Sequence, residues 1–204
     1  AAGGALREAD QTRQLLRERL PHLPQPAQEE AQALLARADA LRARLQAGEG
    51  APPGALKTRY HGDYHLGQVL VTGNDFLIID FEGEPARGFD GRRTKGSPLR
   101  GVAAMLRPSN YARWPALPRV ARAPEDFEAL LAPAQAWELA TRQAFLRAYT
   151  AVQAAGGGSP SAASGLLELY ELQKALYELR YEINNRADWV QVPLRGLLDA
   201  LGPR

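Results

Sequence analysis

The chain has 204 residues, of which 45% are hydrophobic and 24% charged, and it contains no cysteine. This composition is typical of a globular protein with a buried core, and it excludes disulfide frameworks, thiolate metal sites and a cysteine nucleophile. No apolar run approaches the roughly 20 residues of a membrane-spanning helix, and no secretion signal opens the chain. These features predict a cytoplasmic protein with no membrane partner.

The formal net charge of +2 hides an uneven distribution. Between residues 85 and 122 there are nine basic residues and one acidic residue, which leaves about −6 for the rest of the chain. A basic stripe of this kind attracts phosphate groups or nucleic acid. It lacks interleaved aromatic residues and any helix-turn-helix pattern, so we expect no nucleic-acid partner.

In the first half of the chain, helical periodicity predicts helices over residues 5–21 and 26–47, separated by three prolines. Between residues 58 and 81 the apolar residues no longer follow the helical period. Two short apolar runs, 69–72 and 76–79, flank Gly73-Asn74, and this arrangement is a β-hairpin signal.

In the second half, residues 85–124 form a basic, Pro-rich segment for which only one short helix is predicted, over 99–106. Apolar periodicity resumes after it and predicts helices over 125–155, 165–185 and 194–201. The expected fold is therefore mainly α with one small β-hairpin.

The chemistry-bearing residues gather at the base of this hairpin. A hairpin brings the outer ends of its strands together, so Gln68 and Asp80 are expected to lie side by side, with Asp63 on the adjoining loop. A carboxylate and an amide suit Mg²⁺, which takes its other ligands from phosphate and water. The second carboxylate is then available to accept a proton, and this set of roles is that of phosphoryl transfer.

The pattern His61-x-Asp63-x-His65-x-x-Gln68, followed by Ile79-Asp80-Phe81-Glu82, resembles the aminoglycoside-phosphotransferase-like kinases, which have a protein-kinase-like fold. Within that family it is most similar to the bacterial maltokinases, over HGDYHLGQVL…FLIIDFEGEPAR…SPLRGVAAMLR and over the tail from Lys174 to Trp189. The resemblance implies a transferase that uses ATP and Mg²⁺ to convert maltose into maltose 1-phosphate, in trehalose and glycogen metabolism.

Carried over by position, the resemblance assigns the catalytic base to Asp63 and the Mg²⁺ ligands to Gln68 and Asp80. His61 and His65 then shape the nucleotide-binding loop. For the sugar, aromatic faces and carboxylates are the expected contacts, and the candidates are Glu82, Glu84, Tyr177, Glu178, Tyr181, Glu182 and Trp189. Packing roles for these aromatic residues and ion pairs such as Glu182 with Arg186 are the alternative.

The whole of 1–204 resembles only the C-terminal lobe of such a kinase. Its expected parts are a helical hairpin (1–50), the catalytic loop and metal-binding hairpin (58–84), the basic segment (85–124) and a helical subdomain (125–204). No phosphate-binding glycine loop or strand lysine of an N-lobe is present in the sequence. We therefore expect an N-lobe elsewhere in the same polypeptide, behind a fused trehalose synthase domain in some bacteria, and little turnover by this chain alone.

One position departs from the family. Gly101 stands where relatives usually carry an Asp that braces the catalytic loop. This departure leaves open a non-catalytic, regulatory or binding lobe attached to a trehalose synthase or another carbohydrate enzyme.

Two enzyme classes compete on the residues alone. His61-x-Asp63 with a distant His matches the ligand set of a non-haem iron oxygenase, but such sites sit in β-rich barrels. A glycosidase would use two of the carboxylates Asp63, Asp80, Glu82 and Glu84, and would leave Gln68 without a role.

Overall fold

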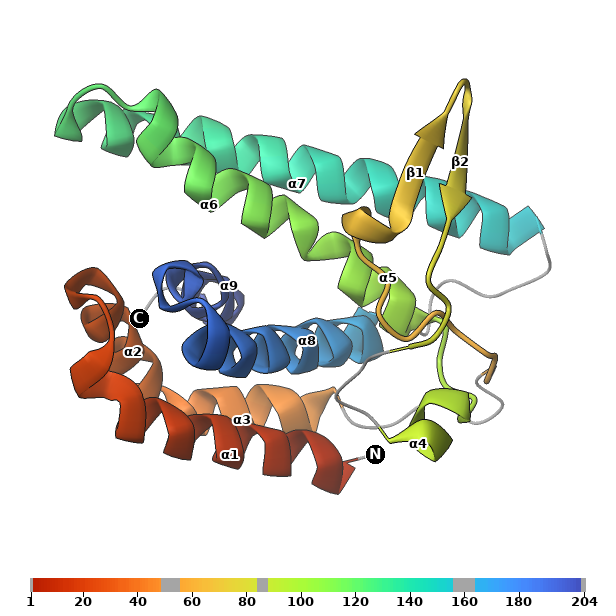
Figure 1. The fold of residues 1–204 in the computed structure, drawn as a ribbon, viewed down its shortest axis with the longest axis horizontal. Coiled ribbons are helices and arrows are strands. Elements are labelled where there is room, and N and C mark those ends of the chain that lie inside the picture. Colours follow the sequence, from red (N-terminus) through yellow and green to blue (C-terminus); the bar gives the residue numbers. More distant parts are fainter. Residues whose placement is uncertain (1, 49–55, 84–87, 156–163, 203–204) are drawn as a thin grey trace.

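A computed structural model describes residues 2–48, 56–83, 88–155 and 164–202. The fold is mostly helical with one two-stranded antiparallel sheet, as the sequence predicts (Figure 1). None of the helices in the described ranges is long and apolar enough to cross a membrane.

The N-terminal part forms three helices: α1 (Ala2–Arg19), α2 (Gln25–Ala36) and α3 (Ala38–Ala47). The single helix predicted over 26–47 is wrong, because it divides at Arg37. The guanidinium of Arg37 donates to the carbonyls of Leu201 and Gly202 at 2.8 and 2.7 Å. This contact caps the end of the last helix. Arg37 and Leu201 are 164 residues apart in the sequence, so no local sequence pattern signals the break.

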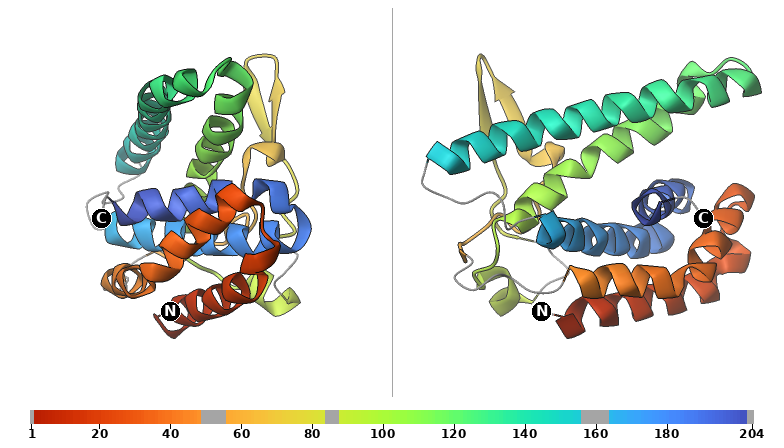
Figure 2. Two further views of the ribbon diagram at one scale, coloured as in Figure 1. Left: turned by 90° about the vertical axis from the view of Figure 1, so that its left-hand side faces the viewer. Right: turned by 180° about the vertical axis from the view of Figure 1, so that it is seen from behind.

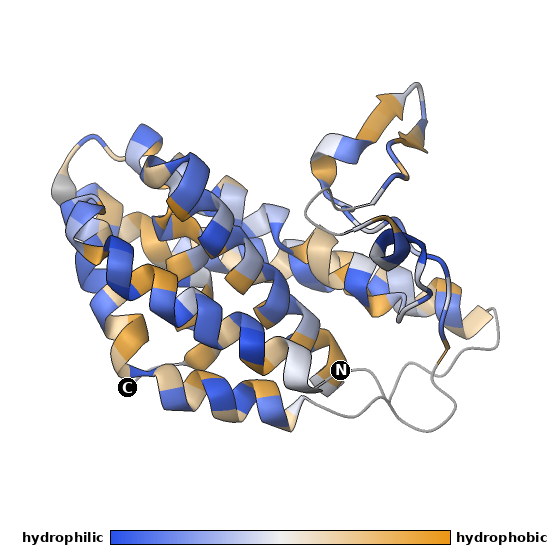
Figure 3. Ribbon diagram, turned by 60° about the horizontal axis from the view of Figure 1, so that its bottom comes forward, coloured by the Kyte–Doolittle hydropathy of each residue, from blue (hydrophilic) through white to orange (hydrophobic). Residues whose placement is uncertain are grey.

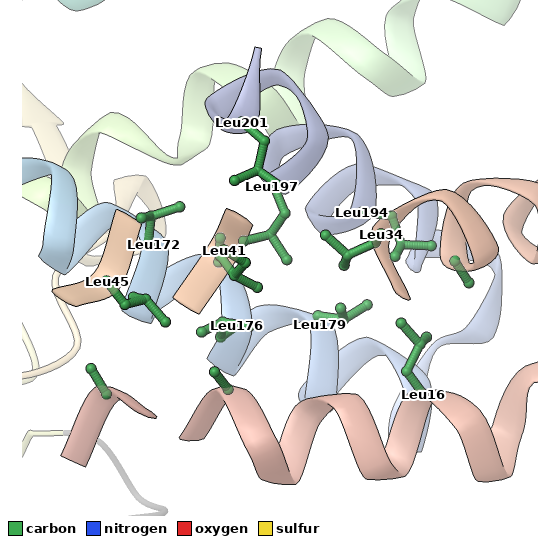
Figure 4. Close-up of a cluster of buried hydrophobic side chains, with 14 of the residues drawn as sticks. Leu16, Leu34, Leu41, Leu45, Leu172, Leu176, Leu179, Leu194, Leu197 and Leu201 are labelled. Atoms are coloured by element: carbon green, nitrogen blue, oxygen red, sulfur yellow. The ribbon is translucent and has the colours of Figure 1, made fainter. Parts of the chain in front are cut away.

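Helix α8 (Ser164–Asn185) lies at the centre, with α1, α3, α5 (Leu99–Leu106) and α9 (Gln191–Leu201) packed around it (Figure 1). A leucine-rich core joins α8 to its neighbours, as Figure 4 shows. Its fully buried members include Leu16, Leu45, Leu172, Leu176, Leu179, Leu194 and Leu197. These burials make α8 the rigid element against which the rest of the chain is placed.

The basic, Pro-rich segment differs most from its prediction. Besides α5, which has the predicted bounds, it contains α4 (Phe89–Arg93) and the 13-residue α6 (Pro108–Val120). Pro108 occupies the first turn, where proline is tolerated, but Pro115 and Pro118 lie inside the helix. Tertiary contacts override that cost, because α6 buries Asn110, Arg113 and Leu117 and packs on α7 (Pro124–Ala155) and α9.

The hairpin consists of β1 (Val69–Thr72) and β2 (Asp75–Ile78), joined by Gly73-Asn74 as predicted. Thr72 pairs with Asp75 and Val69 with Ile78, so the second strand begins one residue before its predicted start. Gly73 has a φ of 58°, which a two-residue hairpin turn requires and glycine adopts without strain. The hairpin projects from the helices, and its apolar residues lie far from the leucine core (Figures 1 and 3).

Candidate active site

The loop that leads into β1 is held by His61, which is only 8% exposed. Its Nε2 lies 2.7 Å from the carbonyl oxygen of Ile79, and its Nδ1 lies 3.4 Å from the backbone N–H of Asp63. An acceptor at Nδ1 makes Nε2 the protonated donor. Its ring also packs 4.8 Å from Phe81, so His61 ties the loop to the segment that follows β2.

A short 3₁₀ helix over Leu66–Gln68 then leads into β1. His65 precedes this turn, and its Nδ1 accepts from the backbone N–H of Gly67 at 3.1 Å. A Cβ at Gly67 would lie 2.8 Å from the His65 ring, so only glycine permits this approach. Both histidines therefore shape the loop, and their contact with a nucleotide stays a prediction.

Asp63 presents a carboxylate that is partly buried and contacted from two sides. Its Oδ1 lies 3.2 Å from Nζ of Lys174 on α8, and its Oδ2 lies 3.9 Å from Nε2 of His65. The Lys174 ammonium also packs 4.6 Å from the centre of the Tyr177 ring. The rigid central helix thus fixes the position of the carboxylate through one ion pair.

Gln68 and Asp80 lie together, as the hairpin predicts. Nε2 of Gln68 donates to Oδ2 of Asp80 at 2.9 Å, and the backbone N–H of Ile79 donates to the Gln68 carbonyl at 3.0 Å. Asp80 has a φ of 61°, a left-handed conformation that non-glycine residues seldom adopt. Such strain is common at functional sites, where the surroundings hold the residue in place.

The pair has the donor chemistry of a Mg²⁺ site. Oε1 of Gln68 and the second carboxylate oxygen of Asp80 are hard oxygen ligands of the kind that Mg²⁺ binds. No cluster of three His, Asp or Glu side chains suited to a metal occurs within the described residues. At a Mg²⁺ site built on this pair, phosphate oxygens and water would supply the other ligands.

Charged side chains recur at four-residue intervals along α8 and just beyond its end: Lys174, Glu178 and Glu182 on the helix, and Arg186 after it. Glu178 accepts from Nε of Arg107 at 2.8 Å in a buried ion pair. Burial raises the pKa of Glu178, while the guanidinium of Arg107 acts in the opposite direction. The helical spacing indicates that these residues share a face, but it does not identify their partners, such as Arg107 between α5 and α6.

Glu182 is 1% exposed, and both of its carboxylate oxygens accept hydrogen bonds. Two nitrogens of Arg186 donate to it at 2.6 and 2.9 Å, and the hydroxyl of Tyr111 donates at 3.0 Å. Burial and the nearby carboxylates Glu178 and Glu182 raise the pKa of Tyr111, which keeps its hydroxyl protonated as a donor. Glu178 and Glu182 thus take part in a structural network, and their predicted sugar contacts stay a prediction.

The other predicted sugar contacts are more accessible. The side chain of Tyr181 is 45% exposed, and its ring stacks 6.4 Å from that of Tyr177. Trp189 lies 6.3 Å from the ring of Tyr111, and Glu82 is exposed. Glu84 lies outside the described residues.

A cavity of about 210 Å³ adjoins the loop, between α1, α5 and α8. Its walls include Gly62, Tyr64, Gly101 and Lys174. A Cβ at Gly101 would meet only the ring of Tyr64, at 3.9 Å, so the place of the family's bracing Asp is open space here. The loop is held instead by His61 and by the pair of Lys174 with Asp63.

The helical lobe, the hairpin and the loop in front of it have the architecture of the C-lobe of a protein-kinase-like fold. Residues 3–83 match the model of the phosphotransferase enzyme family (APH). A glucosamine kinase of Streptacidiphilus jiangxiensis is 28% identical over 144 residues, which are 71% of this chain and 32% of that protein.

The chain is also similar to solved structures. A glucosamine kinase in complex with glucosamine, ADP and inorganic phosphate superposes with a TM-score of 0.75 and 26% identity, over 100% of this chain and 46% of that one. A second structure of glucosamine kinase, crystal form B, gives 0.72 and 25% identity, over 100% of this chain and 47% of that one. The chain thus spans less than half the length of the kinases that it resembles.

Proposed function

We propose that this chain is the catalytic lobe of an ATP-dependent sugar kinase. The observation that carries the proposal is the arrangement at the hairpin base: Asp63, paired with Lys174, lies on the loop that leads to the hydrogen-bonded Gln68 and Asp80. In the intact protein the nucleotide would lie between this lobe and an N-lobe of the same polypeptide. The likeness to kinases twice the length of this chain supports that arrangement.

In the proposed reaction, the acceptor hydroxyl gives its proton to the Asp63 carboxylate while its oxygen bonds to the γ-phosphorus of ATP. The bond from that phosphorus to the β–γ bridging oxygen breaks, and ADP leaves. Gln68 and Asp80 would hold Mg²⁺, which neutralises charge on the phosphates when bound. Most of the acceleration then comes from positioning and charge stabilisation.

For the acceptor we propose a neutral sugar, with maltose as the first candidate. On the described face of α8, the carboxylates of Glu178 and Glu182 are already paired with Arg107 and Arg186. The ammonium group of glucosamine would instead meet the cation Lys174 beside Asp63. The names of the relatives make glucosamine the competing acceptor, so both sugars belong in the test.

The test is sugar-dependent ADP release by the full-length polypeptide, compared with its Asp63→Asn variant. Loss of a general base is expected to lower kcat by about 10² to 10⁴ without changing the fold. Asp75→Asn is the matched control, because Asp75 is an exposed residue at the tip of the same hairpin. A loss of less than tenfold in Asp63→Asn would remove Asp63 from the role of base.

The second candidate is a regulatory lobe without catalysis, attached to a trehalose synthase or another carbohydrate enzyme. Two observations favour it: the open space at Gly101, and a carboxylate at Asp63 that already has a cationic partner. A folded full-length protein that binds ATP, yet releases no ADP with either sugar, would establish this alternative.

A further inference from the structure

The cavity of about 210 Å³ between α1, α5 and α8 has no role in the proposed reaction. Figure 2 shows from behind that α8 lies between α5 and α1. Helix α8 contributes Tyr170, Lys174 and Tyr177 to the wall, at the spacing that places side chains on one face of a helix. The volume is below the roughly 300–1,000 Å³ of drug-sized ligand sites, so it suits a ligand of a few carbon atoms.

Arg100, in the first turn of α5, places a guanidinium group at this cavity. Its Cζ lies 4.3 Å from the centre of the Tyr170 ring, which lines the cavity as well. Within the described residues, no hydrogen bond or ion pair engages this guanidinium, and the side chain is half-buried. A half-buried cation of this kind gains from an anion, and the planar guanidinium binds a carboxylate through two parallel N–H donors.

Lys174 brings a second cation to the same cavity. Its side chain is 19% exposed, and the Tyr177 ring on which its Nζ packs also lines the cavity. An ammonium group has three N–H donors, and Asp63 accepts one of them at 3.2 Å. Tyr170, on which Arg100 stacks, comes one helical turn before Lys174, so the two cations lie along the same stretch of α8.

The charges around the cavity favour an anion with a single charge. Three cations line it, Arg100, Lys174 and Arg180, against one carboxylate, that of Glu8. Arg180 donates to the backbone carbonyl of Glu8, so these two residues lie together at the α1 side. When the carboxylate of Asp63 is counted as well, the described groups retain one positive charge. A monoanion balances that charge, whereas a dianion such as sulfate would exceed it.

The space for such an anion is open because residue 101 is glycine. A Cβ at Gly101 would meet only the ring of Tyr64, at 3.9 Å, which is an ordinary contact. The rings of Tyr64, Tyr170 and Tyr177 line the cavity together. Their apolar faces suit the carbon atoms of an organic acid, while the two cations suit its carboxylate.

We propose that this cavity binds a small organic monocarboxylate, held by the guanidinium of Arg100 and the ammonium of Lys174, with its carbon atoms against the tyrosine rings. The site is distinct from the hairpin base, where Gln68 and Asp80 would hold Mg²⁺, although it shares Lys174 with Asp63. The inference depends on the charges and the space of the cavity and not on phosphoryl transfer.

The test is saturation-transfer NMR of acetate with the full-length protein, in the absence of nucleotide and sugar. Saturation of aromatic protons should reach the methyl group of acetate, because tyrosine rings line the cavity. Arg100→Gln removes the cation and keeps a polar side chain, and we expect the Kd for acetate to rise about tenfold. Arg119→Gln is the matched control, because Arg119 is an exposed residue of α6 outside the lining, and we expect no change.

A second variant tests where acetate binds. Gly101→Leu fills the cavity, and α5 should form as before because leucine favours a helix more than glycine does. We expect this variant to lose acetate binding, whereas Gly165→Leu, at an open position of α8 outside the lining, should retain it. Acetamide has the shape of acetate without its charge and should bind about tenfold more weakly.

The outcomes separate this site from the proposed kinase activity. If Asp63 is not catalytic, ADP release fails, yet acetate still binds and Gly101→Leu still abolishes binding. A folded Gly101→Leu variant, or an Arg100→Gln variant, that binds acetate as tightly as the wild type would overturn the site. Equal affinities for acetate and acetamide would overturn it too, because the cavity would then select shape and not charge. Tighter binding of sulfate would have the same consequence, since the ligand would then be a dianion.

Discussion

Large apolar side chains are buried in the helical body but exposed on the hairpin. In the body, Leu179 and Leu194 are fully buried around α8, whereas in the hairpin Val71 is 74% exposed and Phe76 66% exposed. The proposed active site lies on the hairpin and the loop before it, which contribute no residue to the leucine core. It is fixed by side-chain links: His61 to Ile79 within the segment, and Asp63 to Lys174 on the body.

We therefore expect the body to determine stability and the hairpin base to determine the proposed activity. A core supplies its energy through many contacts that no single surface change removes. A site held by a few polar links is placed accurately only where those links hold. Substitutions in the two regions should therefore separate unfolding from loss of activity.

The largest effect on stability is expected from Leu179→Ala in the body. Removing a fully buried leucine side chain should lower the free energy of unfolding by about 2–5 kcal/mol. Leu70→Ala, the same change on the exposed hairpin, should stay within about 0.5 kcal/mol. Urea denaturation of both variants measures the difference. Equal losses would break the comparison, because they would mean that the hairpin is covered in the intact protein.

A smaller effect is expected at the strained residue of the hairpin base. Asp80→Ala places a residue that disfavours the left-handed conformation at φ 61°, at a cost of about 1 kcal/mol relative to Asp80→Asn, because Asn tolerates it. Hydrogen exchange of the Ile79 amide, which donates to the Gln68 carbonyl, reports opening of this base. We expect roughly fivefold faster exchange in the alanine variant. Equal rates in the two variants would show that the backbone relaxes there at no cost.

Local signals account for what the sequence predicts correctly. The Gly73-Asn74 turn determines the hairpin register, and that register places Gln68 beside Asp80. What the sequence does not reveal depends on distant partners. Lys174 reaches Asp63 across 111 residues, and α6 forms despite its prolines because its buried residues pack on α7 and α9. No window of neighbouring residues contains that information.

The smallest expected effect is a pH dependence of stability at Glu138, a buried carboxyl of α7 that contacts Asn110 and Arg113 of α6. Burial raises the pKa of this carboxyl above its ordinary value, although Arg113 opposes the shift. Between the unfolded and the raised folded pKa, the native state binds more protons than the unfolded chain. The free energy of unfolding therefore falls as the pH rises through that window and is greatest below it.

Glu138→Gln removes this titration and keeps the side-chain shape. The stability of the wild type relative to the variant should therefore increase as the pH is lowered from 7 toward 4, in urea denaturation at matched ionic strength. Glu128→Gln, at an exposed position of α7, controls for the loss of one negative charge. A difference between the wild type and Glu138→Gln that shrinks on acidification would mean that the pairing with Arg113 outweighs burial. The contact between α6 and α7 would then be stabilised chiefly by its ion pairs, unlike the leucine core.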